Sequence, residues 1–71
     1  MKIPDTAALG KAIRKRRKEL GYTQSFLCEF TGFSVSFICD VEKGKPTVEL
    51  GRVLTLAQTL GLDMELSVRG Q

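Results

Sequence analysis

Four glycines divide most of this sequence into short segments whose apolar residues recur at helical spacing. Each glycine follows the last apolar residue of its segment, where it can take the left-handed conformation that ends a helix. The pattern therefore predicts an all-α domain of four helices, the first of which spans about residues 6–20. The expected helices end at Gly21, Gly32, Gly44 and Gly61.

Capping residues stand before the expected helices. Residues 4–6, Pro-Asp-Thr, form a start signal for the first helix, and Thr23 and Ser34 precede the second and third. Thr47 follows a proline and precedes the fourth. A side-chain oxygen at such a position can accept a hydrogen bond from a backbone N–H that the first turn leaves free.

Apolar residues at helical spacing predict which side of each helix faces the core. Gly51 lies within the fourth helix, where glycine costs about 1 kcal/mol relative to alanine, so we expect it to mark a close helix contact. The expected core faces are Leu9, Ala12, Ile13 and Leu20; Phe26, Leu27 and Phe30; Ile38 and Val41; and Leu50, Val53, Leu54, Ala57 and Leu60.

The periodicity changes to two after Gly61, where apolar residues alternate with Asp63, Glu65, Ser67 and Arg69. This alternation predicts one strand at about residues 62–69. A single strand cannot satisfy its own backbone groups, and the simplest partner is its own copy across a two-fold axis. The expected dimer interface consists of Leu62, Met64, Leu66 and Val68.

Composition limits the function classes. The chain has 71 residues, 27% charged and 42% hydrophobic, which is typical of one small soluble domain over residues 1–71. It has no histidine and two cysteines, too few to close a four-ligand zinc site, and it has no phosphate loop or nucleophile–base pair. We expect no enzyme, metal or cofactor, no membrane span, a cytoplasmic location, and oligomerisation to stabilise the small core.

Charge is distributed unevenly. Residues 1–20 contain seven Lys/Arg against two Asp/Glu, a net charge of +5, whereas residues 21–71 contain four against six, a net charge of −2. The cationic end is either a solvated helix face or a surface that binds phosphates. Composition alone leaves both readings open.

A known motif accounts for the middle of the chain. It includes Thr23-Gln24 opening the second helix, Leu27 one turn on, Gly32 in the turn, Ile38 and Val41 in the next helix, and the closing Glu42-Lys43-Gly44-Lys45. These residues resemble the helix-turn-helix of the lambda-repressor/Cro-like, or Xre, family of DNA-binding proteins. The resemblance covers about residues 6–61, with the motif itself at about 23–43.

The end of the chain narrows this resemblance. Most family members continue into a fifth helix, whereas a short chain ending Leu-Asp-Met-Glu-Leu-Ser-Val is similar to the HipB-like antitoxins, whose last strand pairs across a homodimer. The resemblance implies a repressor that binds a pseudo-palindromic double-stranded DNA operator, represses its own operon and binds a HipA-like kinase toxin. A stand-alone phage-type repressor and a protein-interaction module on the same scaffold remain alternatives.

Four residues of the third helix are the expected base contacts. The leading residues of a recognition helix reach base edges in the major groove, and one further residue follows a turn later on the same side. Ser34 could equally serve only as a helix cap, and Val35 could be a plain surface residue. The expected base contacts are Ser34, Val35, Ser36 and Cys39.

Phosphate contacts are expected around these base contacts. The free N–H groups and positive dipole end at the start of the second helix favour an anion. Of the Arg14–Lys18 run, only one or two side chains can face DNA, and Arg16 or Arg17 could instead pair with Glu42. The expected phosphate contacts are Thr23, Gln24, Lys43, Lys45, Arg14 and Arg17.

Two residues depart from the family pattern. Phe37 stands where small hydroxylated residues are common, and it either extends the core or contacts a thymine methyl. Asp40 places a negative charge near the DNA-facing side, where it would repel phosphate unless a cation offsets it or it accepts from a cytosine amino group.

Overall fold

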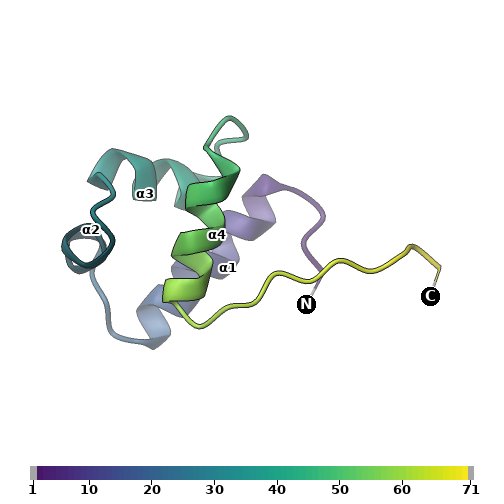
Figure 1. Cartoon of the computed structure of the whole chain (residues 1–71), viewed down its shortest axis with the longest axis horizontal. Coiled ribbons are helices and arrows are strands. Elements are labelled where there is room, and N and C mark those ends of the chain that lie inside the picture. Colours follow the sequence, from purple (N-terminus) through teal and green to yellow (C-terminus); the bar gives the residue numbers. More distant parts are fainter. Residues whose placement is uncertain (1, 71) are drawn as a thin grey trace.

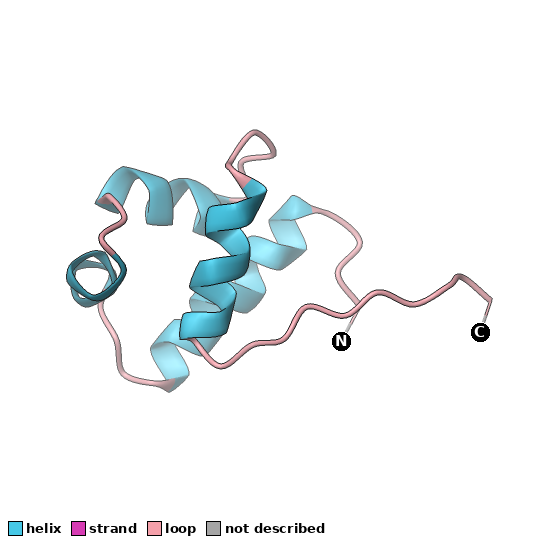
Figure 2. Ribbon diagram, in the orientation of Figure 1, coloured by secondary structure: helices cyan, strands magenta, loops and turns pink. Residues whose placement is uncertain are grey.

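The computed structural model describes residues 2–70, which fold into four helices. Figure 1 shows α3 and α4 beside α1, with α2 at the end of the bundle away from the carboxyl-terminal segment. The all-α, four-helix expectation is confirmed, and the part of the chain that the structure describes contains no strand (Figure 2). The helices are α1 (Thr6–Glu19), α2 (Gln24–Thr31), α3 (Val35–Lys43) and α4 (Leu50–Thr59).

Three of the four helices start as predicted, at side chains that accept a hydrogen bond from the first turn. Asp5 Oδ1 accepts from Ala8 N at 2.8 Å, and Thr23 and Ser34 cap α2 and α3 in the same way. The expectation for Thr47 is wrong. Residues 46–48 form a turn, and α4 starts only after Glu49, which makes no side-chain capping bond.

The core is smaller than the apolar pattern suggests. Phe26 and Phe30 were expected to face it, but they lie on the outer side of α2, where Phe30 is 69% exposed and stacks with Phe26. Helical spacing explains the result, since a helix that packs on one side can bury only part of a wide apolar face. The largest fully buried side chains are those of Ile13, Leu27, Ile38, Val53, Leu56 and Leu60.

Helices α1 and α3 approach each other closely at Gly10. A Cβ atom added to Gly10 would collide with the backbone carbonyl oxygen of Val41 and would lie 2.7 Å from that of Glu42, so no side chain fits unless the backbone shifts. Gly51 shows the opposite: its added Cβ would meet only the Glu49 side chain, at 3.7 Å. The expected close contact at Gly51 is therefore absent within the described chain, and Gly10 has that role.

The segment after α4 leaves the helical body. Leu62 N still donates to Ala57 O at 2.9 Å, but beyond it the chain runs outward in an extended conformation (Figure 1). Leu66 is fully exposed, and Met64 and Val68 are also exposed. In this single chain residues 62–68 form no strand, so pairing with a second copy stays a prediction.

Candidate nucleic-acid interface

The outer side of α3 presents the predicted base contacts. Ile38 and Val41 are buried, so the residues on the opposite side of this helix face outward. Val35 is 50% exposed, Ser36 is exposed and Cys39 is half-buried. This side therefore offers a methyl surface and hydroxyl groups to whatever binds it.

Ser34 acts as the cap of α3. Its hydroxyl oxygen accepts a hydrogen bond from Phe37 N at 3.1 Å, which leaves the hydroxyl hydrogen available to an outside acceptor. The capping role is thus established, and it is compatible with the predicted base contact.

The start of α2 lies beside this surface. Thr23 Oγ1 accepts from Phe26 N at 3.0 Å, and Gln24 Nε2 donates to Glu42 Oε1 at 3.1 Å. The second of these bonds ties the first residue of α2 to α3. It fixes the free N–H end of α2, with its positive dipole, next to α3.

A buried ion pair joins α1 to α3 beneath these groups. Arg17 Nε and Nη2 donate to the two carboxylate oxygens of Glu42 at 2.7 and 3.0 Å, and Nη1 donates to Tyr22 O at 2.9 Å. Only 4% of the Glu42 side chain is exposed. Such a two-pronged bond is the strongest form of arginine–carboxylate pairing.

The pair decides the role of Arg17. The hydrogen bond that Arg17 donates to Glu42, opposed by burial and helped by the carboxylate charge, raises the pKa of Arg17. The stabilisation that goes with this raised pKa is fully present below the usual arginine pKa and is lost as the pH rises above that range. Glu42 and Tyr22 accept three of the five guanidinium N–H groups, so the structure shows the expected alternative in which Arg17 pairs with Glu42, and a phosphate contact of Arg17 stays a prediction.

A hollow brings together predicted residues from all three helices. It is lined by Arg14 of α1, Gln24 of α2, and Cys39 and Lys43 of α3, above the buried pair of Arg17 and Glu42. Lys43 has no carboxylate within 4 Å among residues 2–70. The hollow therefore presents cationic and amide groups, which suit a phosphate.

The two departures from the family pattern have structural explanations. Lys45 Nζ lies 3.5 Å from Asp40 Oδ2, so a cation offsets that negative charge. Because Asp40 partly neutralises Lys45, Lys45 should attract a phosphate less strongly than Lys43 does. The Phe37 ring packs against the core and contacts the Phe33 ring edge-on, with 5.1 Å between the ring centroids. Of the two roles expected for Phe37, the structure therefore shows the one in which it extends the core.

The predicted dimer residues lie apart from this surface. Leu62 is half-buried against the core, whereas Met64, Leu66 and Val68 lie on the segment that runs away from α2 (Figure 1). The residues predicted to contact bases and phosphates thus lie on one surface, and those predicted to form the dimer lie on another.

Sequence reasoning missed the bond between Gln24 and Glu42 and the close approach at Gly10. The partners are 18 residues apart in the first case, and no local pattern links them. A signal existed for Gly10, because a glycine inside a helix and beside core positions usually has a packing reason. Residues 2–70 contain no cluster of His, Cys, Asp or Glu fit to hold a metal, and none of their helices is long and apolar enough to cross a membrane.

Comparison with known sequences identifies a family and two similar proteins. A helix-turn-helix family matches residues 13–66. An uncharacterized HTH-type transcriptional regulator, y4mF, of Sinorhizobium fredii is 37% identical over 70 residues, covering 99% of this chain and 92% of that protein. An uncharacterized HTH-type transcriptional regulator of Haemophilus influenzae is 36% identical over 63 residues, covering 89% of this chain and 62% of that protein.

Among solved structures, chains in HipB complexes have a similar fold. The matched chain in a HipB-O4 20mer complex has a TM-score of 0.87 and 28% identity, covering 97% of this chain and 97% of that chain. The matched chain in a HipA-HipB-O2-O3 complex has the same TM-score, identity and coverage.

Proposed function

Because the chain belongs to the Xre-type helix-turn-helix family of transcriptional regulators, we propose that it represses transcription as a homodimer on a pseudo-palindromic DNA operator. The observation that carries this proposal is the hollow in which Arg14, Gln24 and Lys43 come together beside the outer side of α3. Helices α1, α2 and α3 each contribute a cationic or amide group beside the exposed side of α3. This is the arrangement that a major groove with its flanking phosphates requires.

In this proposal the two kinds of contact have separate tasks. Phosphate contacts from Thr23, Gln24, Arg14, Lys43 and Lys45 set the register of the protein on the duplex and carry no sequence information. These side chains bind the DNA backbone at the edge of the groove. The free N–H groups at the start of α2 bind phosphate there as well. Repression then follows from occupancy of the operator.

The outer side of α3 selects the sequence. Ser34 and Ser36 donate to or accept from base edges, Val35 contacts a thymine methyl, and Cys39 follows one turn later. None of the four is Arg, Asn or Gln, the residues that make two hydrogen bonds to one base. Discrimination per protomer is therefore modest, and a two-fold dimer doubles it.

The likeness to HipB supports a further role as an antitoxin. The solved HipA-HipB-O2-O3 complex joins a chain of this fold to HipA, so the partner proposed here is a HipA-like kinase toxin and the operator that of its own operon. Such a protein acts in the bacterial cytoplasm, at the nucleoid. Co-purification with the protein encoded by the adjacent gene tests this role.

A second candidate is a protein-interaction module on the same scaffold. It is favoured by the two aromatic side chains that α2 exposes, Phe26 and Phe30, whose rings stack with a centroid distance of 6.1 Å. Exposed aromatic groups are enriched where proteins bind proteins. Binding to short duplexes that does not weaken steeply as salt increases would favour this candidate.

The test begins with selection of bound duplexes from a random library. The double variant Val35→Ala with Ser36→Ala should lose about 1–3 kcal/mol of discrimination among the selected sequences while non-specific binding is retained. Lys43→Ala should instead weaken all sequences alike and lower the slope of log K against log salt by about one. If the double variant weakens every duplex equally, α3 does not read the bases.

A further inference from the structure

The outer ridge of α1 is entirely cationic. Its core side consists of Gly10, Ile13 and Arg17, and its exposed side contains four basic residues at the spacing of one helix face. No carboxylate of residues 2–70 lies within 4 Å of any of the four, whereas the neighbouring Arg16 and Arg17 both have one. The ridge residues, with Glu19, line a shallow hollow and are Lys11, Arg14, Lys15 and Lys18.

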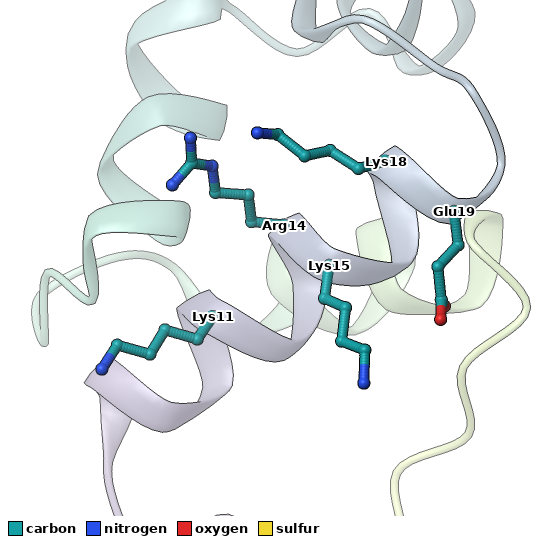
Figure 3. Close-up of a pocket in the computed structure, with 5 residues that line it drawn as sticks. All are labelled: Lys11, Arg14, Lys15, Lys18 and Glu19. Carbon is teal, nitrogen blue, oxygen red and sulfur yellow. The ribbon is translucent and has the colours of Figure 1, made fainter.

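The side chains of this ridge point in two directions. Figure 3 shows Arg14 and Lys18 extending together towards the side of α3, while Lys15 and Glu19 extend to the other side. Helical geometry agrees with this division, because Arg14 and Lys18 are one turn apart on the side of α1 next to Arg17, which bonds to α3. The carboxylate of Glu19 lies 3.8 Å from Arg16 and on the Lys15 side.

Arg14 connects this ridge to the DNA-binding surface. It lines the hollow that also contains Gln24 and Lys43. Lys18 lies one helical turn further, about 6 Å along the axis, at the end of α1 that leads through Tyr22 into the start of α2. A continuous row of cations thus runs from Lys43 through Arg14 to Lys18.

Two like charges that extend into the same space repel each other unless an anion lies between or above them. The arrangement is unfavourable in the isolated chain and becomes favourable when phosphates lie over it. DNA offers one phosphate per strand about every 3.4 Å of helix axis, so a pair of cations about 6 Å apart follows a stretch of one backbone.

We infer that Lys18, together with Arg14, binds the DNA backbone beyond the phosphates held at the start of α2. The inference rests on the proposed function and extends it: the contact of each protomer continues from the major groove across the carboxyl-terminal half of α1. Lys15, one residue from Arg14 in sequence, has no part in this contact. The other reading of the ridge, an acidic protein partner, lacks the continuity with Gln24 and Lys43 that favours DNA.

The test compares two exposed lysines of α1 whose side chains extend in different directions. Full-length protein with Lys18→Ala or Lys15→Ala is titrated with a fluorescent, mixed-sequence DNA duplex at several salt concentrations. Both changes remove one exposed charge from the same helix and keep its propensity. The slope of log K against log salt should decrease by about one per protomer for Lys18→Ala and stay unchanged for Lys15→Ala. Lys18→Arg keeps the positive charge and should therefore have the same slope of log K against log salt as the wild-type protein.

Each outcome decides the inference. Equal slopes for the two alanine variants, changed or unchanged, would overturn it, because the ridge would then act only through its overall charge or not at all. A wild-type protein that binds no duplex at low salt would overturn the proposed function as well, so the two failures are distinguishable. Equal melting temperatures of the variants show that neither change acts through folding.

Discussion

The junction of α1 with α3 buries its side chains, whereas the segment of residues 62–68 leaves most of its apolar side chains exposed. At the junction, Gly10 lets two helices meet, and the buried charges of Arg17 and Glu42 pair with each other through two hydrogen bonds. In the segment, Leu66 and Val68 are exposed although their alternation with polar residues is that of a half-buried strand. The first region is complete within one chain, and the second is not.

This difference separates two requirements of the proposed repressor. The junction holds the start of α2 against α3, because Glu42 bonds to Arg17 and to Gln24 together. One chain is therefore enough to build the surface that reads DNA. In the proposed dimer the exposed apolar face of the segment pairs with a second chain, which would place two such surfaces on an operator.

The largest expected effect concerns the segment. Leu66→Lys puts a charge on its apolar face and should shift the protein from dimer to monomer. Operator affinity should then fall by about 10²- to 10⁴-fold, because each half-site binds alone. Sedimentation at micromolar concentration measures the dimer, and a titration with the selected operator measures the affinity.

Ser67→Lys is the matched control, since it adds the same charge on the polar face of the same segment. It should leave the dimer intact. Deletion of the residues after Leu62 should reproduce the effect of Leu66→Lys. A truncated protein that remains fully dimeric would place dimerisation elsewhere, on α4, and would remove the contrast between the two regions.

A smaller but still large effect is expected at the junction. Glu42→Ala leaves Arg17 buried without its partner, and the loss of one member of a buried pair costs about 3–5 kcal/mol of unfolding free energy. Glu49→Ala removes a carboxylate from the exposed pair with Arg52, where the expected cost is below about 1 kcal/mol. Urea denaturation followed by circular dichroism measures both.

A conservative double variant sharpens this result. Arg17→Met with Glu42→Leu removes both charges together and should recover most of the stability lost in Glu42→Ala, because no unpaired charge remains. DNA binding should stay weak in the double variant, since Gln24 has lost the acceptor that holds it. Equal costs for Glu42→Ala and Glu49→Ala would mean that the junction is no more important to the fold than a surface pair.

Local signals in the sequence were enough to predict the helices. Asp5, Thr23 and Ser34 cap three of them as expected, and the glycines that follow the helices have positive φ angles. Caps and left-handed glycines act within a few residues, so the sequence states them directly. The prediction that Thr47 caps the fourth helix was wrong because residues 46–48 form a turn, and α4 begins only at Leu50.

Properties that depend on distant parts of the chain could not be predicted. An apolar residue does not reveal whether a neighbour will cover it, which is why Phe26 and Phe30 were assigned to the core and lie on the surface. The partner of Arg17 was one of two open alternatives, because 25 residues separate it from Glu42. For the site, the sequence indicated the residues but not which of them the fold already uses.

The smallest expected effects compare two glycines within helices. Gly10→Ala places a methyl group against the backbone carbonyl of Glu42, which cannot move without separating α1 from α3, and should destabilise the fold by about 1–3 kcal/mol. Gly51→Ala meets only open space and the Glu49 side chain. It should stabilise the chain by about 0.4–1 kcal/mol, by restricting the unfolded state. Thermal unfolding of the two variants measures both signs.

The same pair of variants tests whether the junction is the only place where close packing matters. If Gly51→Ala lowers the melting temperature and its effect depends on protein concentration, a second chain packs against Gly51, and α4 belongs to the dimer interface with residues 62–68. If Gly10→Ala is neutral, α1 and α3 can move apart freely. The ion pair of Arg17 and Glu42 would then hold the junction without the close backbone approach, and the start of α2 would depend on that pair alone.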